Sequence, residues 1–83
     1  MKVLEVANEI IKLERSGLNH FDLISKLRNS GVNITKVMTG FSVAHDLEMC
    51  DLKFMILHGT EKISKEDFNL SMSEIISEQK ADD

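Results

Sequence analysis

Histidine and acidic side chains are the residues of this sequence best suited to bind a metal ion. On a helix, His45 and Glu48 would lie one turn apart on the same face, a spacing from which two side chains can share a metal ion. A metal centre needs three or four protein ligands, and no further ligand for this pair is evident in the sequence. We therefore predict no metal site.

Other catalytic patterns are also missing from the sequence. There is no nucleophile motif, no glycine-rich loop that would cradle a phosphate, and no carboxylate pair suited to acid–base work. His58 directly precedes Gly59, which is typical of a helix C-terminus, where a histidine interacts favourably with the helix dipole. We predict no enzymatic activity, no catalytic residue and no cofactor.

The composition describes one small domain with its own core. The chain has 83 residues, of which 42% are hydrophobic and 29% are charged. These proportions are ordinary for a globular protein, although a chain this short buries only about 60% of its unfolded surface. The single cysteine, Cys50, cannot form an internal disulfide, and we predict that it is a small core residue.

Charge and hydropathy bear on location and partners. An acidic residue, Glu5, stands where a signal peptide would need its apolar run, and the longest uncharged apolar run is Phe54–Leu57, which is far too short to span a membrane. We expect a soluble, cytoplasmic protein without membrane contact. The net charge of −4 is uneven, because residues 1–40 carry +2 and residues 41–83 carry −6. Such asymmetry suits a molecule with two different faces.

Three segments carry clear helix signals. Apolar residues recur at helical spacing over 3–15, and Gly17 follows as a C-terminal signal. Asn19 and Ser64 are N-cap residues, each followed three positions later by an aspartate, and they predict helices over 20–30 and from 65 onward. We predict a single domain over residues 1–83, with 80–83 as a frayed tail.

The segment 32–43 leaves two alternatives for the fold class. Its β-branched residues and Gly40 favour a strand, which could pair with 51–58 in a hairpin packed on three helices, giving an α+β fold. Against the hairpin, apolar residues from Val43 to Leu57 recur at spacings of four and three, which favours a helix. We predict an all-α bundle of four or five helices, with the hairpin fold as the alternative.

The stretch Ser42–His58 would carry two apolar rows if it formed one helix. The first row is Val43, Leu47, Cys50, Phe54 and Leu57, and the second is Met49, Leu52 and Ile56. A surface helix buries only one stripe, so the second row should contact a partner. We predict a small regulatory or adaptor protein that binds itself, as a homodimer, and another protein. The predicted interface consists of Met49, Leu52, Met55 and Ile56.

A helix-turn-helix is the alternative interpretation. Gly31 and Val32, followed by Val37, match the turn glycine, the apolar residue after it and a core residue of a recognition helix. The protein would then be a DNA-binding transcriptional regulator, with its more basic N-terminal half on the nucleic acid. The residues predicted to contact DNA are Arg28, Asn33, Thr35 and Lys36.

Overall fold

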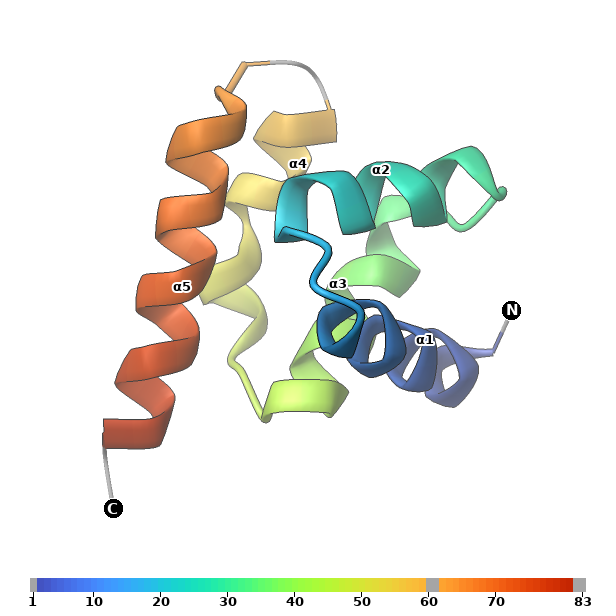
Figure 1. Ribbon diagram of the computed structural model, residues 1–83, viewed down its shortest axis with the longest axis horizontal. Coiled ribbons are helices and arrows are strands. Elements are labelled where there is room, and N and C mark those ends of the chain that lie inside the picture. The colour runs from blue at the N-terminus through green and yellow to red at the C-terminus, as the bar shows by residue number, and fades with distance from the viewer. Residues whose placement is uncertain (1, 60–61, 82–83) are drawn as a thin grey trace.

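The protein is all-α in a computed structural model that describes residues 2–59 and 62–81. Within these residues the chain forms five α-helices, one short 3-10 helix and no strand (Figure 1). The predicted small helical bundle is confirmed, and the hairpin alternative is wrong. The elements are α1 (Val3–Arg15), α2 (His20–Asn29), α3 (Ile34–His45), the 3-10 helix η1 (Met49–Leu52), α4 (Phe54–Gly59) and α5 (Lys65–Ala81).

Local capping chemistry sets the ends of the N-terminal helices. α1 begins at the residue predicted from the sequence, and the backbone N–H of Lys2 donates to the Glu5 carboxylate at 2.9 Å. The Asn19 side chain accepts from the backbone N–H of Asp22, as its N-cap position predicted. Gly17 and Gly31 follow α1 and α2 with φ of 92° and 96°. These positive values are why glycine ends both helices.

Helix α3 forms where the sequence left strand and helix open. The Thr39 hydroxyl donates to the carbonyl of Thr35 one turn earlier, and Val37 is fully buried, so the β-branched residues fit the helix. Gly40 explains the close packing of α3 on α1. A Cβ atom at this position would lie 2.7 Å from Cγ1 of Val6. Glycine is therefore present for helix contact and does not mark a strand.

The predicted continuous helix over 42–58 is wrong, because α3 ends at His45. Asp46 adopts the left-handed conformation, with φ 53° and ψ 51°. Two hydrogen bonds between Leu47 and Ser42 hold the turn. The Leu47 N–H donates to the Ser42 carbonyl at 3.1 Å, and the Ser42 hydroxyl donates to the Leu47 carbonyl at 2.6 Å. Leu47 is buried after this reversal. Beyond the turn, Leu52 of the second apolar row enters the core of the same molecule, whereas Met49 and Ile56 of that row remain exposed.

Helix α5 runs along one edge of the molecule beside α2 and α4 (Figure 1). The Ser64 hydroxyl accepts from the Asp67 N–H, which confirms the predicted N-cap. Two longer-range contacts fix α5 to the start of α2: Asn69 Oδ1 accepts from the Phe21 N–H at 2.8 Å, and Lys65 Nζ lies 3.0 Å from Asp22 Oδ2. Of the predicted frayed tail, 80 and 81 belong to α5 and 82–83 lie outside the described residues.

A single apolar core joins these helices. Its largest fully buried side chains come from every α-helix and from η1, and include Phe41, Phe68, Ile10, Leu23, Leu52 and Met55. None of the helices in the described part of the chain combines the length and the apolar character needed to cross a membrane.

Candidate interaction surface

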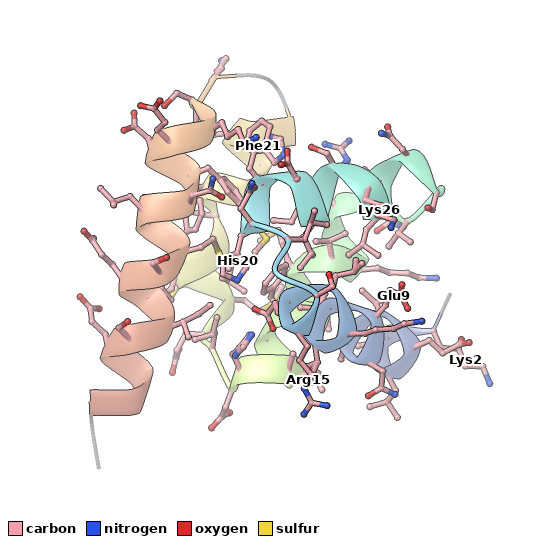
Figure 2. The ribbon with its side chains drawn as sticks, viewed as in Figure 1. Lys2, Glu9, Arg15, His20, Phe21 and Lys26 are labelled. Carbon is pink, nitrogen blue, oxygen red and sulfur yellow. The ribbon has the colours of Figure 1, made fainter. Side chains whose placement is uncertain are left out.

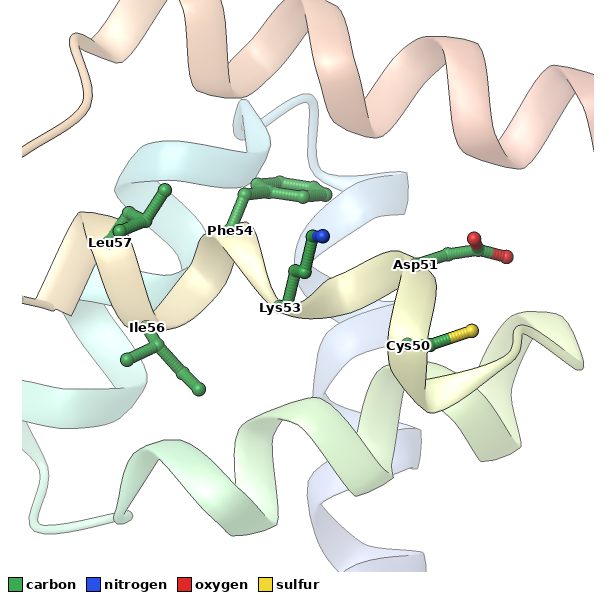
Figure 3. A pocket seen from close by; sticks show the side chains of 6 residues that line it. All are labelled: Cys50, Asp51, Lys53, Phe54, Ile56 and Leu57. Carbon is green, nitrogen blue, oxygen red and sulfur yellow. The ribbon is translucent and has the colours of Figure 1, made fainter.

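A hollow of about 580 Å³ opens on the surface formed by η1 and α4. Cys50 and Asp51 project from η1, Phe54, Ile56 and Leu57 from α4, and Lys53 lies between the two helices (Figure 3). Ile56 and Leu57 are 49% and 44% exposed, and the neighbouring Met49 on η1 is 41% exposed. We call these seven residues, Met49, Cys50, Asp51, Lys53, Phe54, Ile56 and Leu57, the η1–α4 surface.

Two of the four residues predicted for a partner interface lie elsewhere. Leu52 and Met55 are fully buried in the core, whereas Met49 and Ile56 are exposed on the η1–α4 surface. The prediction was wrong for the buried pair because the reversal at Asp46 and the short η1 turn them inward. A partner cannot contact side chains with no accessible surface. The candidate surface is therefore smaller than predicted.

The prediction for Cys50 was also wrong. Its thiol is free and exposed, although the sequence predicted a core residue. The prediction placed Cys50 in a helical row with Leu47 and Phe54, and that row does not exist once α3 ends at His45. The only cysteine of the chain instead places an exposed thiol on the candidate surface.

Apart from the η1–α4 surface, a polar cluster around the Glu14 carboxylate joins three helices. His20 Nε2 lies 2.7 Å from Glu14 Oε2, and His45 Nε2 lies 2.8 Å from the same oxygen. His20 begins α2, His45 ends α3, and Glu14 stands in the last turn of α1. The carboxylate and both imidazoles are only 19% exposed. Figure 2 shows His20 beside the link from α1 to α2.

The protonation of this cluster follows from its geometry. Partial burial opposes the charged form of Glu14, but hydrogen bonds from His20 and His45, together with their charges, outweigh it and lower the pKa of Glu14 to about 2. Because an ionised carboxylate only accepts, each Nε2 carries a hydrogen. A carboxylate with so low a pKa is a weak base. The arrangement is therefore suited to holding α1, α2 and α3 together.

The cluster differs from the metal ligands considered in the sequence. His45 contacts Glu14, whereas Glu48 is the residue before η1. Among the described residues, no group of three or more histidine, cysteine or acidic side chains is placed to hold a metal ion. Sequence spacing could have paired Glu14 with His20 across the short Gly17 turn. It gave no signal for His45, which is 31 residues away from Glu14.

His58 belongs to an aromatic cluster. Its ring centroid lies 3.8 Å from that of Phe21 and 4.9 Å from that of Phe68, and its Nε2 is 3.4 Å from Ser25 Oγ. Burial lowers the pKa of His58, which favours the neutral ring. The predicted dipole interaction of a charged histidine at this helix end is therefore weakened, and packing against α2 and α5 explains the residue better.

The residues predicted to contact DNA lie along α2, the following turn and the start of α3. Arg28 and Thr35 are exposed, and Lys36 is half-buried. Asn33 has a local task, because its side chain accepts from the Lys36 N–H at 2.9 Å as the N-cap of α3. Gly31 and the buried Val32 and Val37 take the turn and core positions predicted for them. The link from α2 to α3 thus has the positive-φ glycine and the buried apolar residues that the sequence predicted.

The fold and surface define a small five-helix protein with an apolar hollow on its shortest α-helix, counted over the described residues. Comparison with known proteins gives no match to a family model, a curated protein or a solved structure.

Proposed function

We propose that this protein is a non-enzymatic regulator or adaptor that acts by protein–protein interaction, with a second copy of itself and a further protein as its partners. The η1–α4 surface carries the proposal. The exposed apolar side chains of Ile56 and Leu57 line a hollow of about 580 Å³, and Met49, which precedes the lining residue Cys50, is also exposed. Exposed apolar side chains gathered around a concavity are typical of docking sites for other proteins.

The arrangement of the charged groups supports the proposal. Asp51 and Lys53 line the hollow, and neither makes an ion pair with another residue in the described part of the chain. Charges within an interaction surface set the orientation of a partner and speed its association. A side chain that enters the hollow would contact the Phe54 ring and Ile56.

The test compares two exposed apolar residues from different parts of the molecule. Ile56→Asp places a charge in the η1–α4 surface, and Leu70→Asp places the same charge on α5, where Leu70 is 63% exposed. Both variants should fold, because neither side chain belongs to the core. Proteins cross-linked to wild type in cells should be lost with Ile56→Asp and retained with Leu70→Asp. Equal recovery with both variants would refute the proposed surface.

DNA binding is the second candidate function. It is favoured by the link from α2 to α3, in which Gly31 has a φ of 96° and Val32 enters the core, as in a helix-turn-helix. Arg28 stands exposed at the end of α2 and could contact a phosphate. Duplex binding measured by fluorescence anisotropy should then weaken steeply with salt and with Arg28→Glu or Lys36→Glu. Duplex binding that changes neither with salt nor with Arg28→Glu or Lys36→Glu would exclude this function.

A further inference from the structure

We infer that the partner seated on the η1–α4 surface is a second copy of this chain, related to the first by a two-fold axis that passes between Asp51 and Lys53. The inference rests on the proposed interaction function and names the occupant of its site. The two ionisable side chains of opposite sign that line the hollow stand two residues apart, at the junction of η1 and α4 (Figure 3).

In a two-fold interface, each contact between Asp51 of one copy and Lys53 of the other occurs twice. Under this symmetry, a contact of residue i with residue j is repeated as a contact of j with i. Asp51 of each copy then meets Lys53 of the other, and two ion pairs form from charges that have no ion-pair partner among the described residues of the single chain. A patch that bears one charge of each sign is therefore complementary to itself.

The apolar side chains obey the same symmetry. Ile56 lies on the α4 side of Lys53, and Cys50 lies on the η1 side of Asp51 (Figure 3). Rotation about an axis between Asp51 and Lys53 exchanges these two sides. Ile56 of one copy is thereby directed toward Cys50 and the exposed Met49 of the other. Apolar atoms of the two copies then cover one another on both sides of the axis, and the two ion pairs lie at the axis itself.

The exposed apolar side chains of α4 supply a second reason for pairing. Association stabilises the folded form by mass action. α4 is the shortest α-helix of the described chain, with six residues, and three of them line the hollow. Covering this helix with a second copy removes its exposed apolar side chains from water.

Charge reversal tests the symmetry directly. Lys53→Asp gives a patch with two acidic groups, and Asp51→Lys gives a patch with two basic groups. Each variant alone should associate at least about tenfold more weakly than wild type, because like charges meet across the axis. An equimolar mixture of the two should form a one-to-one heterodimer, measured by sedimentation equilibrium and native mass spectrometry. Lys12→Asp, at an exposed α1 residue, is the control and should leave wild-type association unchanged.

The outcomes separate this inference from the proposed function. Wild type that sediments as a monomer at about 500 µM, or single reversals that dimerise as well as wild type, would overturn the second copy as occupant. In either case, loss of cellular partners with Ile56→Asp and their retention with Leu70→Asp would still support the proposed interaction with a further protein. A heterodimer formed only by the mixture would support the inference. All exchanged residues are exposed, so circular dichroism should show unchanged helix content in every variant.

Discussion

The carboxylate of Glu14 accepts a hydrogen bond from His45, with Oε2 and Nε2 only 2.8 Å apart, although the two residues are separated by 31 positions. The same oxygen lies 2.7 Å from His20 Nε2. One acidic side chain at the end of α1 therefore joins the start of α2 to the end of α3. Its contribution to stability should be large for a single polar residue, because hydrogen bonds to charged groups are stronger than neutral ones.

Glu14→Gln should lower the free energy of unfolding by about 2 kcal/mol at pH 7, because it removes the charge that both imidazoles contact. Chemical denaturation should measure this loss. Glu78→Gln, at an exposed position of α5, is the matched control and should change stability by less than about 0.5 kcal/mol. Equal stabilities for the two variants would show that the cluster contributes nothing.

Acid should remove the contribution of Glu14 over a defined range. Its pKa is lowered from the ordinary value of 4.5 to about 2, so the stabilisation is complete above pH 4.5 and is lost as pH falls toward 2. A shift of this size corresponds to roughly 3 kcal/mol. Unfolding measured between pH 5 and about pH 2 should therefore show a steeper loss for wild type than for Glu14→Gln. Parallel curves would contradict the lowered pKa.

Leu52 and Ile56 should respond very differently to truncation, although the sequence assigned both to one interface. Leu52 is fully buried, so Leu52→Ala should cost about 2–5 kcal/mol through lost packing and a cavity. Ile56 is 49% exposed, and Ile56→Ala should cost less than about 1 kcal/mol. Urea denaturation of the two variants at low protein concentration makes the comparison. Similar costs would mean that Leu52 is not a core residue.

Gly40→Ala should destabilise the protein even though alanine favours helix. The added Cβ would lie 2.7 Å from Val6 Cγ1, and overpacking of this kind costs about 1–3 kcal/mol against a gain of about 1 kcal/mol in helix propensity. Thermal unfolding measures the balance. Adding Val6→Ala should lessen the effect of Gly40→Ala, because it removes the opposing methyl group. An increase in melting temperature for Gly40→Ala alone would refute the close α1–α3 contact.

Asn33 should stabilise the fold as the N-cap of α3, whether or not the protein binds DNA. Asn33→Ala should cost about 1 kcal/mol, because the Lys36 N–H loses its acceptor, whereas Asn33→Ser should retain most of the stability. Thermal or urea unfolding distinguishes the two variants. If serine proves as destabilising as alanine, the capping role is wrong.

The Cys50 thiol should react in the folded protein. It is exposed on η1, so a disulfide reagent such as dithionitrobenzoate should modify one thiol per chain without denaturant. The reaction should slow as protein concentration rises if a second copy covers the η1–α4 surface. A thiol that reacts only after unfolding would place Cys50 in the core, as the sequence first indicated.

Helix ends were predictable because their signals are local. The bounds of α1 and the caps at Asn19 and Ser64 depend on residues within one turn, and all three are confirmed. The reversal at Asp46 was not predictable, because the apolar periodicity continues across it and no glycine or proline marks it. The burial of Leu52 follows from that reversal. The bond between Glu14 and His45 depends on how α1 and α3 pack, which no short-range pattern encodes.

The paired hydrogen bonds between Ser42 and Leu47 have a dynamic consequence. Leu47 lies outside every helix of the described chain, yet its amide is held by the Ser42 carbonyl and its own carbonyl by the Ser42 hydroxyl. These two bonds hold the turn after α3, and we expect it to resist local opening. In deuterated water, the Leu47 amide should retain its proton as long as amides in the middle of α3, and should release it only when the whole molecule opens.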